Sequence, residues 1–153
     1  MNPSFHIVLY QPEIPPNTGN IMRLCSATNS ILHLIHPLGF RFDDKAMKRA
    51  AMDYAENVDI RQWKDWEEFM AGEKPARLFF IETKTDQYYT EARFVAGDYL
   101  VFGRESKGLP DSLLEQFAGQ TIKIPMFNEH ARSLNLANSV AIVLYEAIRQ
   151  QGK

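Results

Sequence analysis

The stretch TIKIPMFNEHARSLNLAN, residues 121–138, decides the fold because it takes the chain from a strand through a polar loop onto a helix. Residues 121–124 are β-prone, and Pro125 ends the strand because proline has no N–H to donate to a ladder. Ser133 is predicted to cap a helix that runs to about Arg149. The start of such a helix leaves N–H groups without intrahelical partners, so it can hold an anion or the polar edge of a ligand.

Small polar residues near this helix start allow two interpretations. Ser133 and Asn135 would bring hydrogen-bonding side chains to the first turn, where a ligand could meet them. Alternatively, Ser133 is only a cap and Asn135 only a surface residue. The apolar face of the helix is predicted from residues at helical spacing, namely Leu134, Ala137, Val140, Ala141, Leu144 and Ile148.

Short β-rich runs alternate with helical patterns along the rest of the chain. Further strands are predicted at residues 5–10, 31–36, 58–61, 77–82 and 99–103. Helices are predicted from Asn17 or Thr18 to Ala27, from Asp43 to Tyr54, and over 65–70 and 110–117. This alternation favours an α/β fold with a mainly parallel sheet flanked by helices, and with ligands at the carboxyl ends of the strands. Without repeats or linkers, residues 1–153 are predicted to form a single domain.

Composition restricts the class of protein. A content of 45% hydrophobic and 24% charged residues is ordinary for a soluble globular protein. No apolar run approaches the roughly 20 residues that span a bilayer, so a cytoplasmic protein without membrane contact is predicted. The net charge of −2 argues against a basic surface over the whole chain, so any nucleic-acid binding must use local patches.

Cysteine and histidine usage gives little sign of a metal or a nucleophile. The single cysteine, Cys25, excludes an internal disulfide and lies at helical spacing among apolar residues, which predicts a core position. The four histidines show no i, i+4 pairing and no cysteine partners, so no metal site is predicted: His6, His33, His36 and His130.

Two other strand-to-loop transitions carry unusual residues. In NTGNIMR, Asn17 and Arg23 fall within two turns of the predicted helix start and could flank a cleft, although Arg23 could equally be a solvated charge. In FGRESKGLP, residues 102–110, two glycines bracket a charged turn directly after a buried strand, which makes a plausible ligand cradle. The fingerprints of a P-loop and of a dinucleotide-binding turn are both missing from the sequence.

The segments NTGNIMR, FGRESKGLP and IPMFNEHARSLNLANSVA resemble, in order and spacing, the three motifs of the SPOUT methyltransferases. The resemblance covers essentially the whole chain and is strongest to the branch that methylates the ribose 2′-oxygen of the tRNA wobble nucleotide, a cytidine or modified uridine. It implies an α/β sheet with a deep C-terminal trefoil knot. Topology rules alone would have rejected a knot.

The same resemblance implies S-adenosylmethionine as the methyl donor, held largely by backbone groups of three loops. The residues that match are Ile81, Gly103, Ile124, Met126, Ser133 and Leu134. Apolar side chains would shield the faces of the adenine while main-chain groups read its edges. For Ile81, Ile124 and Met126, a simple core role is the alternative.

Five matching positions are implied in catalysis or substrate placement: Asn17, Arg23, Glu105, Ser133 and Asn135. Because a guanidinium stays protonated, Arg23 is hypothesised to clamp a phosphate and stabilise developing alkoxide charge rather than act as a base. Asn17 and Glu105 would then orient Arg23 or the hydroxyl. The middle motif varies in the family at Arg104, Ser106 and Lys107, for which only RNA contact is expected.

The partners implied are tRNA and a second copy of the chain, with a homodimer formed through the knot region and the last helix. Local basic residues such as Lys107 and Arg132 could contribute to an RNA surface. Tyr145 is expected either in the subunit interface or supporting the active site. Alternative functions are methylation of another RNA such as ribosomal RNA, a catalytically silent RNA-binding protein, and nucleotide binding without methyl transfer.

Overall fold

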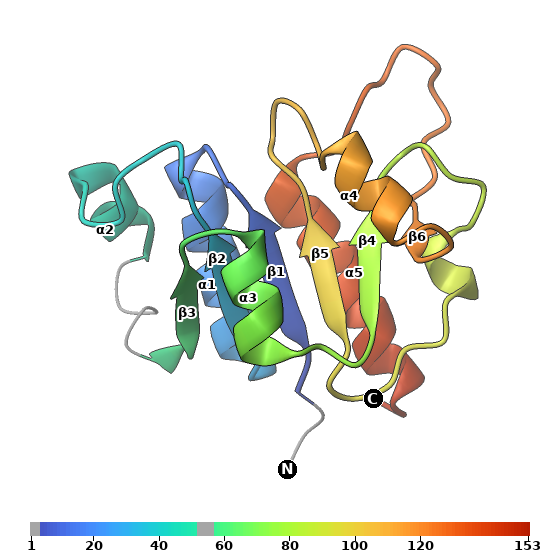
Figure 1. The fold of residues 1–153 in the computed structure, drawn as a ribbon, viewed down its shortest axis with the longest axis horizontal. Helices are drawn as coiled ribbons and strands as arrows, with labels where there is room; N and C mark the ends of the chain where they lie inside the picture. Colours follow the sequence, from blue (N-terminus) through green and yellow to red (C-terminus); the bar gives the residue numbers. More distant parts are fainter. Residues whose placement is uncertain (1–3, 52–56) are drawn as a thin grey trace.

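A six-stranded parallel sheet with helices on both faces forms the frame of the computed structural model, which describes residues 4–51 and 57–153 (Figure 1). The strand order is β3-β2-β1-β5-β4-β6. The strands are β1 (His6–Tyr10), β2 (Ile31–Ile35), β3 (Ile60–Trp63), β4 (Leu78–Ile81), β5 (Tyr99–Phe102) and β6 (Thr121–Ile122). Since every neighbouring pair runs parallel, the carboxyl ends of all six strands meet at one edge of the sheet.

The helices cover the two faces unequally. One face carries α1 (Pro15–Thr28), α2 (Lys45–Ala51) and α5 (Leu136–Gln150), and the other carries α3 (Trp66–Glu73) and α4 (Asp111–Gln116). A short 3₁₀ helix, Tyr89–Glu91, precedes β5. None of the helices in the described part of the chain has the length and apolar character of a membrane span.

Two apolar cores result, one on each face of the sheet. On β1, Ile7 and Leu9 pack with α1 and α5, while Val8 between them packs with α3 and α4. All three side chains are essentially inaccessible to solvent, which explains why β1 reads as a continuous apolar run. Cys25 lies in the first core as predicted, and burial raises the pKa of its thiol to about 12.

The predicted α/β architecture is confirmed, and five strands lie where the sequence predicted them, with ends shifted by one or two residues. β3 was predicted at 58–61 but spans Ile60–Trp63, because its register with β2 pairs Leu32 with Ile60 and Ile35 with Trp63. The trefoil knot depends on how the chain is threaded and not on strand order, so it stays a prediction, as does the single domain.

The predicted start of α1 was wrong. Neither Asn17 nor Thr18 is the cap, since α1 begins at Pro15 with Ile14 at the N-cap position. Pro15 and Pro16 occupy the first helical positions, where their missing N–H groups leave nothing unsatisfied.

The predicted start of α5 was also wrong. Ser133 is not its cap, because the helix begins at Leu136 and the side chain of Asn135 accepts a hydrogen bond from the N–H of Asn138. Leu134 therefore precedes the helix and is not part of its apolar face. The predicted second helix is shorter, Lys45–Ala51, and its proposed member Tyr54 lies outside the described residues.

Candidate active site

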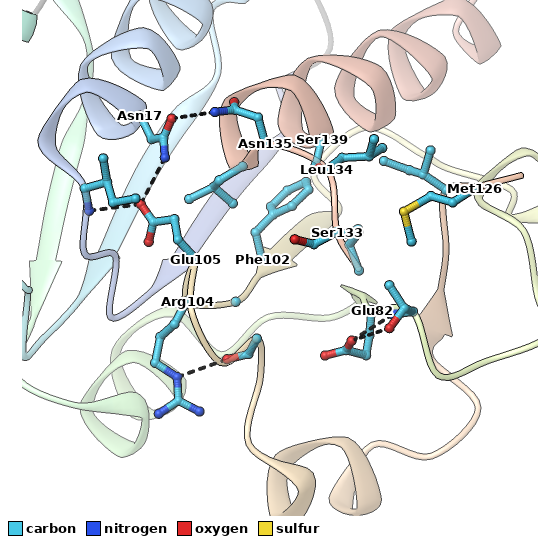
Figure 2. A pocket seen from close by; sticks show the side chains of 17 residues that line it. Asn17, Glu82, Phe102, Arg104, Glu105, Met126, Ser133, Leu134, Asn135 and Ser139 are labelled. Atoms are coloured by element: carbon cyan, nitrogen blue, oxygen red, sulfur yellow. Dashed lines mark hydrogen bonds between the residues drawn. The ribbon is translucent and has the colours of Figure 1, made fainter. Parts of the chain in front are cut away.

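A cavity of about 290 Å³ opens at the carboxyl ends of β4 and β5, between loops that are distant in sequence (Figure 2). Parallel α/β sheets characteristically bind ligands at this edge. The residues that line it are Ile14, Asn17, Ile81, Glu82, Thr83, Phe102, Gly103, Arg104, Glu105, Gly108, Ile124, Met126, Ser133, Leu134, Asn135, Leu136 and Ser139.

The cavity gathers most of the residues singled out from the sequence. The six assigned to the methyl donor all line it: Ile81, Gly103, Ile124, Met126, Ser133 and Leu134. So do four of the five assigned to catalysis, namely Asn17, Glu105, Ser133 and Asn135. Of the basic and aromatic residues assigned to RNA, Arg104 lines it.

Hydrogen bonds tie the three motif segments together. Glu105 accepts from the Asn17 Nδ2 atom at 3.3 Å, and the Asn17 Oδ1 atom accepts from Asn135 Nδ2 at 3.0 Å (Figure 2). A carboxylate can only accept, so the amide nitrogen of Asn17 must face Glu105 and its oxygen must face Asn135. The oxygen of Asn135 is then left to cap α5 through Asn138, at 3.1 Å. Glu105 thereby fixes the orientation of both side-chain amides in this hydrogen-bonded series, those of Asn17 and Asn135.

Glu105 also holds the start of α1. Its carboxylate accepts from the backbone N–H groups of Glu13 at 2.8 Å and Ile14 at 3.0 Å. These amides precede the two prolines of α1, so an acidic residue from another loop supplies the cap that no nearby side chain provides. Four hydrogen bonds thus join the loop after β5 to α1 and, through Asn17, to the start of α5.

A reciprocal contact, missed in the sequence, closes the same two loops. The carboxylate of Glu13 accepts from the Ser106 N–H at 2.9 Å and from its hydroxyl at 2.8 Å. These hydrogen bonds lower the pKa of Glu13. Glu13 lies in a proline-rich loop 93 residues before Ser106, so local sequence gave no signal for the pair. Ser106 makes this contact within the chain, and its expected contact with RNA stays a prediction.

The turn after β5 depends on two glycines, as the sequence suggested. A Cβ on Gly103 would lie 2.4 Å from the carbonyl carbon of Gly108, so no side chain fits there. Gly108 itself has a φ of +66°, a region that favours glycine. Backbone hydrogen bonds in both directions between Arg104 and Gly108 close the turn.

Of the remaining predicted residues, only Arg104 lines the cavity, and its contacts are also structural. The guanidinium of Arg104 donates to the Gly108 carbonyl at 3.0 Å and lies over the Tyr10 ring, so part of its role is structural. Lys107 and Arg132 are exposed. Arg23 is exposed on α1 and does not lie among the described residues that line the cavity.

Two exposed aromatic side chains lie outside the cavity. Tyr145, on the outer face of α5, is 50% exposed. Phe127 directly follows the cavity residue Met126 and is 95% exposed, which is unusual for so large an apolar side chain. Phe127 was not singled out from the sequence, although an aromatic residue inside a polar loop is a signal that could have found it.

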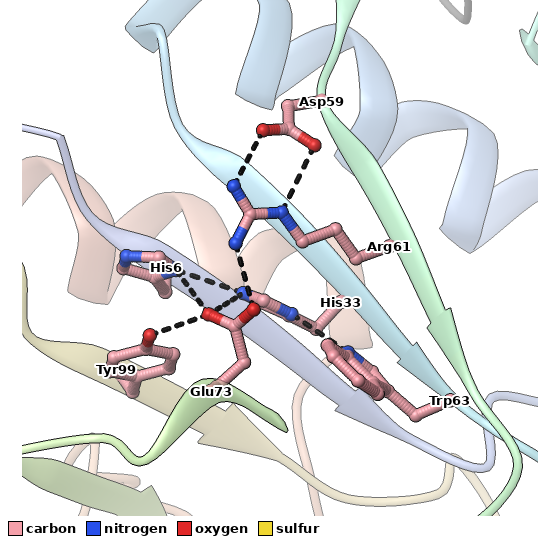
Figure 3. Close-up of polar contacts among 7 residues, drawn as sticks. All are labelled: His6, His33, Asp59, Arg61, Trp63, Glu73 and Tyr99. Carbon is pink, nitrogen blue, oxygen red and sulfur yellow. Dashed lines mark hydrogen bonds and ion pairs between the residues drawn. The ribbon is translucent and has the colours of Figure 1, made fainter. Parts of the chain in front are cut away.

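Two histidines that are far apart in sequence, His6 and His33, lie close together at the end of the sheet opposite the cavity. His6, His33 and Glu73 form the one group among the described residues that could hold a metal ion (Figure 3). The indole N–H of Trp63 donates to His33 Nδ1 at 3.0 Å. Neutral His33 therefore carries its proton on Nε2, the atom that lies 2.8 Å from His6 Nδ1. A proton at that position favours a hydrogen bond over metal ligation.

The same cluster contains a carboxylate held by several donors. Glu73 accepts from the Tyr99 hydroxyl at 2.7 Å and from Arg61 at 2.8 Å (Figure 3). Burial lowers the pKa of His33 to about 3 and also lowers the pKa of His6, with Glu73 opposing both effects. Both imidazoles are therefore neutral at physiological pH.

Comparisons with known proteins extend over the whole cavity. A sequence profile described as the SpoU rRNA Methylase family matches residues 4–145. A tRNA (cytidine(34)-2′-O)-methyltransferase from Aeromonas hydrophila subsp. hydrophila is 50% identical over 147 residues, which cover 95% of this chain and 94% of that relative. The matched ranges include all three segments that form the cavity.

Solved structures agree with the fold. One described as "Structural insights into the 2-OH methylation of C/U34 on tRNA" is 45% identical, with a TM-score of 0.91 and coverage of 98% of both chains. An AdoMet-bound rRNA methyltransferase from Sinorhizobium meliloti is 25% identical, with a TM-score of 0.84. That match covers 97% of this chain and 58% of the other.

Proposed function

The chain belongs to the SpoU rRNA methylase family, and on that premise we propose that it is a single-domain tRNA methyltransferase. It methylates the ribose 2′-hydroxyl of the wobble nucleotide, position 34, a cytidine or modified uridine. Its methyl donor is S-adenosylmethionine, and no metal ion takes part in the proposed reaction. Because tRNA is its substrate, we place its work in the cytoplasm.

One observation carries the proposal. Segments around residues 17, 105 and 135, far apart in sequence, are joined by a single chain of hydrogen bonds at the rim of one cavity. A relative that shares half of its residues with this chain over nearly its full length is named for methylation of cytidine 34. A silent RNA-binding descendant would have no need to keep this arrangement.

The walls of the cavity suit an amphipathic nucleoside. Ile81, Phe102, Ile124 and Leu136 offer apolar surface for the faces of an adenine, and backbone groups of the same loops can read its edges. Asn17 and Ser133 add polar groups at the rim. When bound, S-adenosylmethionine supplies an electrophilic methyl group on a sulfonium. The protein must hold the 2′-oxygen in line with that methyl group and exclude water.

The proposed roles follow from the hydrogen-bond pattern. Glu105 is a positioning residue, because its carboxylate already accepts from two backbone amides and from Asn17. Asn17 and Asn135 hold the rim of the cavity in one shape. Arg23 clamps a phosphate next to the target ribose and stabilises negative charge that develops on the 2′-oxygen.

In a homodimer, Arg23 of one copy could reach the cavity of the other copy. On this chain Arg23 lies on α1, next to a shallow groove lined by Asn20 and Leu24 of α1 and by Ala137 and Ala141 of α5. Tyr145 and Ile142 on α5 are exposed as well. We propose that a second copy covers this face, and that its cavity receives the arginine.

Mixing two inactive variants tests this arrangement. Arg23→Ala and Asn135→Ala each disable every site of their own dimers. A mixed dimer regains activity if the arginine acts on the partner's cavity, because one of its two sites is then intact. Mixed dimers that sediment as dimers but stay inactive would refute the shared site.

We propose that RNA binds beside the cavity mouth, over the loop that follows β6. Lys107 and Arg132 are exposed and can neutralise phosphates. Phe127 offers a free aromatic face on which an unpaired anticodon-loop base can stack, a contact worth about 1–3 kcal/mol. Recognition of a single-stranded loop needs only a local basic patch, which is compatible with the net charge of −2.

The decisive experiment is incubation of the purified protein with labelled S-adenosylmethionine and bulk tRNA from cells that lack this modification. Mass spectrometry of nuclease digests is expected to find the label as a 2′-O-methyl group at position 34. Label on a base ring, or on ribosomal RNA alone, would overturn the substrate. Equal affinities for ATP, NAD and S-adenosylmethionine in calorimetry would instead indicate a general nucleotide-binding protein.

A further inference from the structure

Glu82 places a second carboxylate on the cavity, away from the rim of amides. It directly follows β4, and Figure 2 shows it on the opposite side of the cavity from Asn17 and Asn135. One carboxylate oxygen, Oε1, accepts from the N–H of Thr83 at 2.8 Å and from its hydroxyl at 3.2 Å. The other, Oε2, has the Leu109 N–H at 3.4 Å, the limit of a hydrogen bond.

The position of Oε2 is fixed by the glycine turn. It lies so close to Gly108 that a Cβ on that residue would approach it to 2.9 Å. Phe102 and Ile124, which also line the cavity, cannot donate hydrogen bonds to it from their side chains. A carboxylate beside apolar walls is stabilised when a ligand donates to its remaining lone pairs.

We propose that Glu82 binds the ribose hydroxyls of the methyl donor, an inference that rests on the proposed function. The ribose offers two adjacent O–H donors, which match the two oxygens of a carboxylate. Two other parts of the ligand match Glu82 less well. The edge of adenine alternates donors with acceptors, and a carboxylate repels the acceptors. The ammonium of the amino-acid part lies beside the ligand's own carboxylate, which would repel Glu82. In dinucleotide-binding α/β folds an acidic residue takes the same partner, a ribose hydroxyl.

Calorimetry with three ligands separates the groups that Glu82 could contact. S-adenosylhomocysteine carries ribose and amino acid, 5′-methylthioadenosine lacks the amino acid, and 2′,3′-dideoxyadenosine lacks the hydroxyls. Glu82→Gln is expected to weaken the first two equally, by roughly tenfold or more, as for the loss of a charged hydrogen bond. The dideoxynucleoside should bind to both proteins alike.

Two further variants separate the proposed contact from a general effect of removing a negative charge. Glu82→Asp keeps the charge but shortens the reach, so it should lose affinity as Glu82→Gln does. Glu115→Gln, on the exposed face of α4, removes a charge far from the cavity and should change nothing.

The alternative outcomes separate a failure of the ribose contact from a failure of the proposed function. A penalty that vanishes with 5′-methylthioadenosine would assign Glu82 to the ammonium, and one that persists with the dideoxynucleoside would make its role structural. Both refute the ribose contact. If the unaltered protein binds neither S-adenosylmethionine nor its product, the proposed function itself fails.

Discussion

Glu105 shows how one carboxylate can join segments that are far apart in sequence. Its two oxygens accept from Glu13 N–H, Ile14 N–H and the Asn17 amide, which uses most of its lone pairs. Its value lies in bringing the loop after β5 against the start of α1.

Glu105→Gln should therefore destabilise the protein as well as the site. The new NH₂ group would face backbone N–H donors, so at least one of these part-buried or exposed hydrogen bonds would be lost, at a cost of about 0.5–1.5 kcal/mol. Denaturant unfolding would measure this loss, and Glu115→Gln is the matched control. Unfolding curves that coincide for the two variants would show that Glu105 holds nothing together.

Arg23→Lys tests the other residue-scale hypothesis. Lysine keeps the charge but loses the planar fork that grips a phosphate bidentately. We expect affinity for S-adenosylmethionine to stay within about twofold, since the proposed partner of Arg23 is an RNA phosphate and not the methyl donor, while turnover falls by roughly tenfold or more. Single-turnover kinetics separate the two quantities, and unchanged turnover would remove Arg23 from this role.

At the scale of elements, the start of α5 serves both the fold and the site. Asn135 accepts from Asn138 N–H to cap the helix and donates to Asn17 to complete the rim of the cavity. Its carbonyl oxygen and its amide nitrogen thus have separate tasks. Substitutions can remove one task and leave the other.

Asn135→Asp and Asn135→Ala should separate these tasks. Aspartate keeps the cap but turns a second oxygen toward Asn17 Oδ1, so stability should be retained while activity falls. Alanine loses the cap as well and should lower the free energy of unfolding by about 1 kcal/mol. Thermal unfolding and methyl-transfer assays measure the two effects. Equal stability of the two variants would contradict the cap.

Element boundaries show where sequence reasoning stops. Strand patterns are set by local burial and predicted the sheet, whereas the start of α1 was predicted three or four residues late and the start of α5 two residues early. The start of α1 is held by a distant partner, since Glu105 lies 91 residues from Ile14. The cap of α5 is local, because Asn135 accepts from the N–H of Asn138, three residues away. A local preference for serine or asparagine could have found the cap of α5, but it contains no information about the contact of Glu105 with α1.

At the scale of the whole molecule, the histidine cluster was equally invisible in the sequence. His6 and His33 come together because parallel register places β1 beside β2, and Glu73 reaches them from the end of α3. The residues lining the cavity were easier to find, because motif resemblance carries long-range information that spacing lacks. Glu82 and Glu13 lie outside the three quoted motifs, and Phe127 lies in the third without a role implied for it, so all three were found only from the fold.

The cluster predicts acid sensitivity. His33 is buried and neutral in the fold, with its pKa lowered to about 3 from 6.5, so the unfolded chain binds its proton first as pH falls. Stability is fully present above pH 6.5 and is lost progressively toward pH 3. Between pH 7 and pH 5 this histidine alone should cost about 2 kcal/mol.

Denaturant unfolding between pH 7 and pH 5 measures how steeply the free energy of unfolding falls as the pH is lowered. His33→Gln can still accept from Trp63 and donate to His6, and it should flatten the pH dependence. His130→Gln changes an exposed histidine and should leave the slope as it was. Equal slopes for all three proteins would assign the acid sensitivity to other groups, such as Glu73 with its partners Arg61 and Tyr99.

The span of the cavity also bears on synthesis of the protein. Its walls come from residues as far apart as Ile14 and Ser139, out of 153. A nascent polypeptide leaving the ribosome consequently cannot complete the cavity until Ser139 has been synthesised. Truncated products of interrupted translation would thus be inert, and could not compete with intact enzyme for its methyl donor.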